Sequence, residues 1–451
     1  MSMIVNAARK MATESKPTLV LGLGLTGYSV IRHLAGTGSE VTAADSREFP
    51  PYLKRVKDEF PGVEIITGEI PYGRFQGFSQ IVASPGLDLG ELGVAGTRVL
   101  GDIELFARQA DAPSIGITGS NGKSTVTMLV KTMLEAAGRR VKAGGNLGTP
   151  ALDLLDGEPT DFYVLELSSF QLESTHSLDL VSATVLNLSE DHMDRYDGLA
   201  EYARAKTRIF RHAGQCIVNR DDPLSRACLH SRASPVSFGL GPPENHLDFG
   251  LLTKDGRRML VKGKRVLVDA DLLTLPGDHN IANILAAMAL VDASGVALTP
   301  GVVNAAAGYG GLPHRCEIVS RADGVQWIND SKGTNAGATI AAIKGFSLPL
   351  ILIAGGQGKG ADFGPLAEVI AQQVNHTILF GEDAQAIASR LDESVQHTRA
   401  ASLEEAVSIA KRRARPGWGV LFSPACASFD LFDNYAHRGN VFRNLVLEGV
   451  H

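Results

Sequence analysis

The stretch Gly116-Ile-Thr-Gly-Ser-Asn-Gly-Lys-Ser-Thr125 carries the strongest structural signal in the chain. A possible β-strand at 112–117 leads into it, and residues 124–137 have the apolar spacing of a helix. A glycine-rich turn between a strand and a helix exposes backbone N–H groups at the helix N-terminus, where the helix dipole favours anions. Lys123 adds a mobile positive charge, and Ser124 adds a hydroxyl of the kind that holds Mg²⁺. The stretch therefore predicts a loop that binds a nucleoside triphosphate.

The loop departs from the pattern G-x-x-x-x-G-K-[ST] at one place, because Ile117 stands where the first glycine is expected. A chance Gly-Lys-Ser turn with no ligand is the alternative interpretation. The strand before the loop and the helix after it favour phosphate binding.

The composition is typical of a multidomain α/β protein. With 451 residues, of which 44% are hydrophobic, the chain is long enough for roughly two to four domains. A formal net charge of −6 and the absence of a long basic run argue against nucleic acid as the main partner. The four cysteines form no C-x-x-C pair, which indicates a reducing compartment and no zinc cage. We find no signal-peptide pattern and no apolar run near the ~20 residues of a membrane span, so we expect a cytoplasmic protein.

Strands and helices alternate along three successive regions, which predicts an α/β protein of three domains. Residues 237–273 differ, because short alternating segments with turns predict a small antiparallel patch there. The expected domains are a Rossmann-like domain at 1–107, a central P-loop ATPase-type domain at 108–313 and a second Rossmann-like domain at 314–451.

The segment Gly22-Leu-Gly-Leu-Thr-Gly27 matches G-x-G-x-x-G after a predicted strand, and Asp45 ends the next strand. By itself this pattern predicts a nicotinamide dehydrogenase. Physically it shows only that a diphosphate can approach a helix N-terminus closely, so a UDP-sugar fits equally well, and a purely structural turn is a third possibility. A second, ATP-type loop has no obvious use in a dehydrogenase.

Two polar segments follow predicted strands in the central region. Glu166 ends the strand at 161–167, at the sheet edge where Mg²⁺ is usually held beside a phosphate loop. His192 lies in a polar loop after the next strand and could ligate a metal or position phosphate. Lys206 lies in the predicted helix at 199–210, where its context indicates only a solvated charge.

Taken together, the motifs are more specific than any one of them. They are Thr118–Thr125, Gly145–Gly148, Glu166–Gln171, Asp191–Asp194, His279–Asn283 and Pro313–Arg315. This set resembles the Mur ligases, the ATP-dependent amino-acid-adding enzymes of peptidoglycan synthesis. In the last region, further motifs are similar to the family member that adds D-glutamate. They are Asn329–Asn335, Gly355–Asp362 and Ser423–Asp430.

The resemblance implies an ATP-dependent ligase that adds D-glutamate to UDP-N-acetylmuramoyl-L-alanine through an acyl phosphate, giving ADP and phosphate. The main catalytic demand is neutralisation of charge around the transferred phosphoryl group. The implied cofactors are ATP and Mg²⁺, with two ions expected. The implied metal ligands are Ser124, Glu166, His192 and a carbamylated Lys206, and the implied catalytic residues are Lys123, His192, Lys206 and Arg315.

The same resemblance implies the binding residues. For ATP they are Gly119, Ser120, Asn121, Gly122, Lys123, Ser124, Thr125, Asn280, Asn283, Arg315 and Asp330. For the UDP substrate they are Gly24, Leu25, Thr26, Asp45, Ser46, Arg47, Gly86, Asn146, Ser168 and Gln171. For D-glutamate they are Thr334, Lys359, Ser428, Phe429 and Tyr435.

Other interpretations remain open. A diaminopimelate-adding ligase should show Asp-Asn-Pro-Arg in its last region, and the sequence has none there. A folylpolyglutamate synthetase belongs to the same ligase class, whereas a nicotinamide dehydrogenase leaves Lys123, Glu166 and His192 unexplained. A non-catalytic nucleotide-binding module leaves the polar motifs of the last region unexplained. We expect small-molecule substrates as partners and a monomer.

Overall fold

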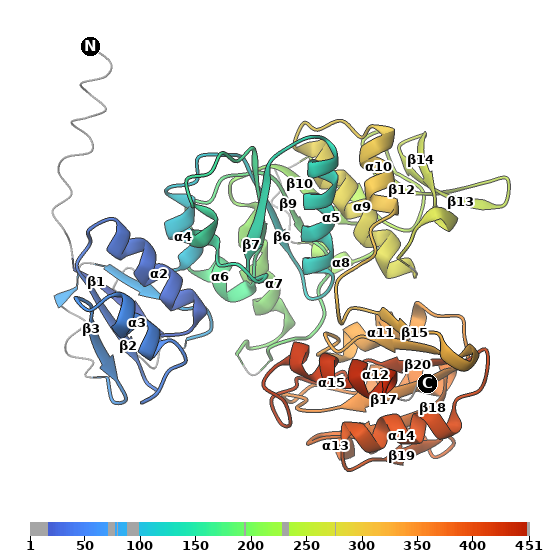
Figure 1. The fold of residues 1–451 in the computed structure, drawn as a ribbon. Coiled ribbons are helices and arrows are strands. Elements are labelled where there is room, and N and C mark those ends of the chain that lie inside the picture. Colours follow the sequence, from blue (N-terminus) through green and yellow to red (C-terminus); the bar gives the residue numbers. More distant parts are fainter. Residues whose placement is uncertain are drawn as a thin grey trace. The chain divides into compact units, whose positions relative to one another are not determined.

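The computed structural model describes residues 17–70, 77–78, 80–87, 99–193, 195–227, 234–275 and 277–448. Residues 1–10, which precede the first expected strand, lie outside the described residues. The described chain contains three sheets, each with helices packed on it (Figure 1).

The first sheet has the order β3-β2-β1-β4-β5, and its neighbouring strands pair in parallel. Leu19 and Leu21 alternate with Val20 along β1, and all three are buried because helices and loops cover the sheet. Its elements are β1 (Thr18–Leu21), α2 (Leu25–Gly36), β2 (Val41–Asp45), α3 (Leu53–Glu59), β3 (Glu64–Thr67), β4 (Gln80–Ala83) and β5 (Val99–Leu100).

The second sheet has the order β14-β13-β12-β11-β10-β9-β6-β8-β7. Its first six strands in chain order are β6 (Ser114–Thr118), β7 (Val141–Gly145), β8 (Phe162–Glu166), β9 (Leu180–Val185), β10 (Ala213–Asn219) and β11 (Val236–Phe238), and β7 lies at one edge. The helical segments among them are α4 (Asp102–Ala107), α5 (Lys123–Ala136), η2 (Ala151–Leu154), α6 (Ser169–Glu173), α7 (Leu199–Thr207), η3 (Arg208–Phe210) and α8 (Pro223–Ala227).

The predicted antiparallel patch is confirmed at one edge of this sheet. Strands β12 (Phe249–Lys254), β13 (Arg257–Lys262) and β14 (Arg265–Asp269) pair antiparallel. Asp255 and Gly256 both have positive φ between the first two strands, which suits a tight hairpin turn. Helices α9 (Asp278–Ala293) and α10 (Pro300–Ala307) follow, and both pack against α5.

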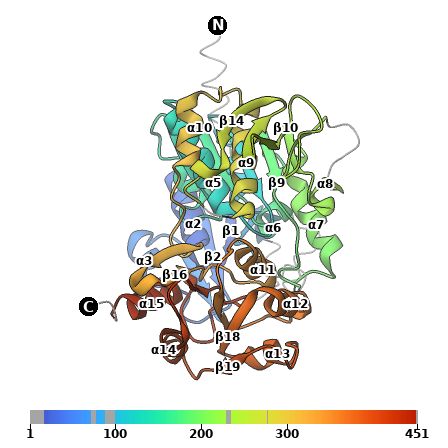
Figure 2. The same ribbon diagram turned by 90° about the vertical axis from the view of Figure 1, so that its right-hand side faces the viewer.

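The third sheet is doubly wound, with the order β15-β16-β20-β17-β18-β19. Along β17, Leu350, Leu352 and Ala354 face one set of helices, and Ile351 and Ile353 face the other set. Figure 2 shows α11, α12 and α13 on one side of these strands and α14 and α15 on the other. The elements are β15 (Glu317–Ser320), β16 (Gln326–Asn329), α11 (Ala336–Lys344), β17 (Leu350–Gly355), α12 (Gly364–Gln373), β18 (Val374–Phe380), α13 (Ala384–Ala388), β19 (His397–Arg399), α14 (Leu403–Arg413), β20 (Gly419–Phe422) and α15 (Tyr435–Leu447).

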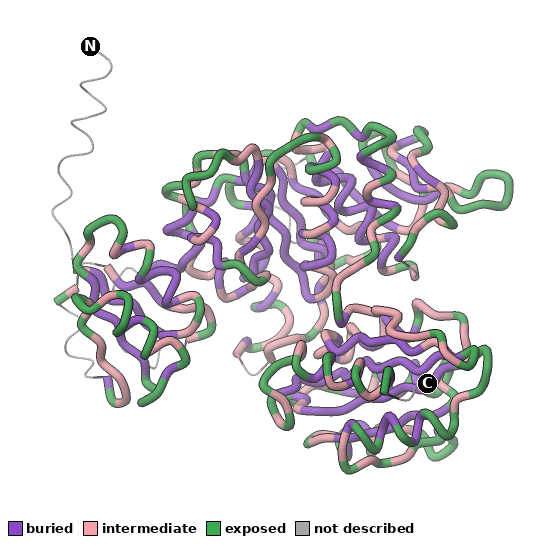
Figure 3. Tube along the Cα trace, in the orientation of Figure 1, coloured by how far each residue is buried: buried purple, intermediate pink, exposed green. Residues whose placement is uncertain are grey.

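The central strands of all three sheets are buried, whereas edge strands such as β3, β14 and β19 are partly exposed, and other exposed residues lie at helix surfaces and loop tips (Figure 3). Contacts divide the described chain into two compact units. The first contains the described residues up to Thr118 with Gly138–Thr184 and Ala205–Cys216, and the second contains the rest. This division runs through the central sheet, so the expected domain boundaries near 107 and 313 stay predictions. None of the described helices has the length and apolar character of a membrane span.

The turn after β1 yields a sharp stability prediction. A Cβ atom on Gly27 would lie 1.7 Å from the carbonyl oxygen of Gly22, whereas a Cβ on Gly36 of the same helix meets nothing within 4 Å. We expect Gly27→Ala to lower the free energy of unfolding by more than about 2 kcal/mol, because backbone must move. Gly36→Ala should leave it unchanged or raise it by up to about 1 kcal/mol. Urea unfolding followed by circular dichroism measures both, and equal midpoints for the two variants would contradict the close packing at this turn.

Candidate active site

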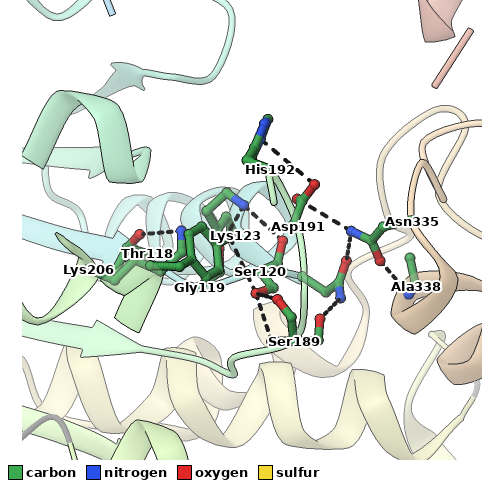
Figure 4. Close-up of polar contacts among 12 residues, drawn as sticks. Thr118, Gly119, Ser120, Lys123, Ser189, Asp191, His192, Lys206, Asn335 and Ala338 are labelled. Carbon is green, nitrogen blue, oxygen red and sulfur yellow. Dashed lines mark hydrogen bonds and ion pairs between the residues drawn. The ribbon is translucent and has the colours of Figure 1, made fainter. Parts of the chain in front are cut away.

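The loop between β6 and α5 has the geometry of an anion-binding turn. Gly122, the residue before α5, has φ +83° and a Cβ there would lie 2.5 Å from Asn283 Oδ1, so only glycine fits. The Lys123 ammonium bends back over the loop and donates to the carbonyl oxygens of Gly119 and Ser120, at 2.8 and 2.9 Å (Figure 4). This arrangement places a cation beside the first backbone N–H groups of a long helix.

The position of Ile117 explains the departure from the glycine-rich pattern. Ile117 is fully buried within β6 and pairs with Glu166 of β8, so it belongs to the sheet rather than to the turn. Gly119 makes the turn instead, with φ +149°. The turn therefore begins after Ile117. The buried strand position at 117 needs an apolar side chain rather than a glycine.

A second loop, after β9, holds the nucleotide loop in place. Asn187 accepts a hydrogen bond from Asn121 N–H at 2.8 Å and returns one from its side-chain amide to Asn121 O at 3.0 Å. Ser120 and Ser189 exchange two further bonds, at 2.9 and 3.0 Å. These reciprocal bonds tie the backbone of one loop to the other. The sequence places Asn187 in a polar segment after a strand but gives no sign of this role.

A cavity of about 360 Å³ adjoins this loop. Its size lies within the range of small-molecule sites. It brings together expected ATP-binding residues that lie far apart in sequence. These are Asn121, Gly122, Thr125, Asn280, Asn283, Arg315 and Asp330. Phe238, Leu275 and Leu312 add apolar surface, as a nucleobase requires. The other expected nucleotide residues, Gly119, Ser120, Lys123 and Ser124, are not among the residues that line it.

Arg315 and Asp330 are linked to the loops around this cavity. Arg315 Nη2 lies 2.5 Å from Ser124 Oγ, which brings an expected phosphate-neutralising residue to an expected metal ligand. Asp330 accepts hydrogen bonds from Ser423 Oγ and Cys316 N–H, at 2.7 and 3.2 Å. Burial raises the pKa of Asp330 to about 6 despite these bonds.

The expected metal ligands fall in both compact units. In the first, Glu166 is buried at the end of β8 and accepts from Asn146 Nδ2 at 2.6 Å. Lys206 is 1% exposed, with Nζ 3.4 Å from Thr118 Oγ1. In the second, His192 has φ +59° and lies 3.8 Å from Asp191.

Within the described residues, no three His, Cys, Asp or Glu side chains gather closely enough to hold a metal ion. That finding concerns only those four residue types. The expected set uses a serine hydroxyl and a modified lysine, and it stays a prediction.

Seven of the ten expected UDP-substrate residues lie at the carboxyl ends of β1, β2 and β4. Asp45 accepts from Leu23 N–H at 2.7 Å and forms an ion pair with Arg47 at 2.6 Å. Burial alone would raise the pKa of Asp45, but the bonds from Arg47 and Leu23 outweigh it, so the pKa lies below its ordinary value. Gly86 has φ +88°, so its turn also requires glycine. Gly24, Leu25 and Thr26 begin α2 at this edge, and Ser46 follows Asp45.

Ser168 and Gln171 already have partners within the protein. Ser168 accepts from Gln171 N–H and Gln171 Oε1 accepts from Ser168 N–H, which is a capping box at the start of α6. The Gln171 amide also donates to Asp102 at 3.2 Å. In this structure both ends of the Gln171 amide serve the fold, although the family resemblance implies that it lies against substrate.

The expected D-glutamate residues lie in loops of the third sheet. Lys359 has φ +51°, and its Nζ lies 5.8 Å from the centroid of the Phe429 ring. Lys332, which is not among the expected residues, lies 4.0 Å from the centroid of the Tyr435 ring. Thr334 lies in the same turn as Lys332, because its N–H donates to the Lys332 carbonyl oxygen. The Ser428 side chain is buried.

Arg438 was missed by sequence reasoning, because a helical arginine is usually a solvated charge. Its side chain is fully buried and donates to the carbonyl oxygens of Ser331, Cys426 and Ala427 and to Ser331 Oγ. Burial lowers its pKa to about 10. Arg438 therefore ties the loop after β16 to the loop after β20.

The burial of the Asp102 carboxyl predicts a pH dependence of stability. Burial raises the pKa of Asp102 to about 6 in the folded protein, above its ordinary value of 3.8. The stability that this carboxyl contributes is therefore fully present below pH 3.8 and is lost as pH rises through 6. We expect the free energy of unfolding of Asp102→Asn, relative to the unsubstituted chain, to rise by about 2 kcal/mol between about pH 4.5 and 7.5.

Urea unfolding at several pH values measures this difference. Asp161→Asn is the control, because hydrogen bonds from Arg140 lower the pKa of Asp161 to about 2 and keep it charged over the whole range. A stability difference for Asp102→Asn that does not change with pH would show that burial does not raise this pKa.

Comparisons with known proteins identify the family. The chain matches the MurD-like N-terminal domain of Mur ligases over residues 16–101, the Mur ligase middle domain over 117–291 and the Mur ligase, glutamate ligase domain over 314–426. The UDP-N-acetylmuramoylalanine–D-glutamate ligase of Marinobacter nauticus is 49% identical over 445 residues, which are 97% of this chain and 99% of that protein. The protein of the same name from Pseudomonas aeruginosa is 46% identical over 439 residues, 95% of this chain and 97% of that protein.

Solved structures agree in fold. The UDP-N-acetylmuramate-alanine ligase MurC of Thermotoga maritima has a TM-score of 0.61 at 18% identity, over 96% of this chain and all of that one. E. coli FolC, in complex with DHPP and ADP, has a TM-score of 0.59 at 16% identity, over 79% and 96%. These similarities support the α/β architecture expected from the sequence. The chain therefore belongs to the Mur ligase family and groups with its UDP-N-acetylmuramoylalanine–D-glutamate ligases.

Proposed function

We infer that the chain joins D-glutamate to UDP-N-acetylmuramoyl-L-alanine with consumption of ATP, a step of peptidoglycan precursor synthesis. Relatives that bear this name are 46–49% identical over nearly the whole chain. The geometry that supports the inference best is the cavity beside the nucleotide loop, where Asn280, Arg315 and Asp330 converge from separate elements. The activity of a nicotinamide dehydrogenase would not explain why these three residues line one cavity beside the nucleotide loop.

The cavity would hold ATP. Its apolar lining and the amides of Asn280 and Asn283 suit the adenine, and the Asp330 carboxylate suits the ribose hydroxyls. The N-terminus of α5 and the Lys123 ammonium would hold the phosphates. The 2.8 and 2.9 Å bonds of Lys123 to loop carbonyls must then be exchanged for bonds to phosphate oxygens.

Ser124, Glu166, His192 and Lys206 would hold Mg²⁺, which supplies charge neutralisation for the transferred phosphoryl group. The donor set fits a hard cation once Lys206 is carbamylated, because the carbamate presents oxygens in place of an ammonium. The burial of Lys206 supports this modification, since a buried ammonium is costly.

The substrates would bind at separate loops. The turn from Gly22 to Gly27 with Asp45 and Arg47 would hold the UDP moiety, and Asn146 with the start of α6 would lie against its sugar and alanyl part. Lys359 and Ser428 would bind the two carboxylates of D-glutamate, with Thr334, Phe429 and Tyr435 around them. The substrate carboxylate takes the γ-phosphoryl group of ATP. The D-glutamate amine then attacks the acyl carbon and phosphate leaves.

We further propose a cytoplasmic monomer with small-molecule substrates only and the domain boundaries expected from the sequence. The net charge of −6 is consistent with the absence of a nucleic-acid partner.

A phosphate-release assay with UDP-N-acetylmuramoyl-L-alanine and single amino acids tests the function. We expect release with D-glutamate and at least about a hundredfold less with L-glutamate or diaminopimelate, because a misplaced amine loses the orientation that the reaction needs. Release with L-glutamate or diaminopimelate but not with D-glutamate would contradict the assignment.

The Lys206→Ala variant, measured in the same assay, tests the proposed metal-binding role of Lys206. It should lose activity and regain part of it when formate or acetate is added, because a small anion can replace the carbamate oxygens. Full activity without added anion would exclude the metal-binding role of Lys206 and leave the substrate assignment intact.

A further inference from the structure

One carboxylate joins the helix of the proposed UDP site to the central region. Asp153 of η2 accepts a hydrogen bond from Ser29 Oγ of α2, and Arg32 Nη2 of the same helix lies 2.5 Å from Asp153 Oδ1. The Asp153 side chain is 18% exposed and the Arg32 side chain is 46% exposed, so only the carboxylate end of the ion pair is shielded from solvent. Partial burial makes such a pair worth more than an exposed one.

The segment that carries Asp153 is firmly attached to the central sheet. Its flanking residues Leu152 and Leu154 are buried. Just before it, Gly145 N–H donates to Thr149 O at 2.8 Å and closes the loop that contains Asn146. Asn146 in turn bonds to Glu166 through both its backbone N–H and its side chain, at 2.8 and 2.6 Å. Asp153 is therefore coupled through one short loop to two residues of the proposed reaction site.

The other end of the contact is the helix that begins at the diphosphate turn. Helix α2 starts at Leu25, directly after Gly24, and Ser29 lies just one turn further on. Because an α-helix is stiff over this length, a shift at Ser29 is transmitted to the turn that would hold the diphosphate.

A pocket adjoins the contact between α2 and η2. A cavity of about 530 Å³ lies beside it, lined on one side by Ser29, Arg32 and His33 and on the other by Leu152 and Asp153. A second polar contact joins His33 Nε2 to Gln109 Nε2 at 2.8 Å. The polar bonds of Ser29, Arg32 and His33 therefore contribute to the geometry of this contact.

We propose that Asp153 is a positioning residue of the ligase: it fixes the distance between the UDP-binding turn and the Asn146–Glu166 pair that meets the other end of the substrate. The inference rests on the proposed function, since the affinity of a ligand depends on this distance only when the ligand contacts both places. UDP alone would occupy only the turn, so its affinity would not depend on this distance.

Binding of UDP and of UDP-N-acetylmuramoyl-L-alanine, measured by calorimetry on the full chain, separates the two cases. We expect Asp153→Ala to weaken binding of the full substrate about tenfold and to leave UDP binding unchanged, because only the span between the two contact points is altered. Asp153→Asn should fall between, since it keeps an acceptor for Ser29 and loses the charge for Arg32. In turnover, KM for the UDP substrate should rise while KM for ATP stays constant.

Asp156→Asn is the matched control. Asp156 lies three residues away and lines the same cavity, but its partner is Lys142 rather than α2. It should bind both ligands as the unsubstituted chain does. Equal loss of UDP and full-substrate affinity in Asp153→Ala, or no loss at all, would overturn the positioning role. An unsubstituted chain that binds the full substrate no better than UDP would instead contradict the proposed function, and this inference with it.

Discussion

The exchange of hydrogen bonds between Asn121 and Asn187 is the interaction on which the nucleotide site depends. The Asn187 side chain accepts from the backbone of Asn121 and donates back to it, so the nucleotide loop cannot shift without breaking two bonds at once. Two further hydrogen bonds, between Ser120 and Ser189, join the same two loops. A loop that must present backbone N–H groups to phosphate benefits from being held before the ligand arrives, because reorganisation then costs little.

The rest of the site follows from the topology of parallel sheets. The carboxyl ends of neighbouring parallel strands meet at one edge, so Ile117, Gly145 and Glu166 come together although they lie far apart in sequence. The same rule gathers the turns after β1, β2 and β4 at the edge of the first sheet. In the third sheet a buried arginine, Arg438, has the equivalent effect by bonding to the carbonyl oxygens of two loops.

The parts of this structure that the sequence predicts are those with local signals. The strand, turn and helix at 112–137 and the antiparallel patch at 237–273 have patterns that a short window contains. The roles of Asn187 and Arg438 could not be predicted in this way, because an asparagine after a strand and an arginine in a helix are usually solvated. The bond between Gln171 and Asp102 joins residues 69 positions apart and has no local signature. In the expected metal set, Ser124, Glu166 and His192 have local signals, whereas Lys206 is implied by family resemblance alone, and the set stays a prediction.

The most direct test of phosphoryl transfer to the substrate is the fate of its carboxylate oxygen. If the γ-phosphoryl group of ATP moves to that carboxylate, then UDP-N-acetylmuramoyl-L-alanine labelled with ¹⁸O in its carboxylate must pass one labelled oxygen to the phosphate released with D-glutamate. Phosphorus NMR of the phosphate detects the label by its isotope shift. We expect one ¹⁸O in each phosphate formed, and phosphate without label would contradict an acyl-phosphate route and the part that the nucleotide loop plays in it.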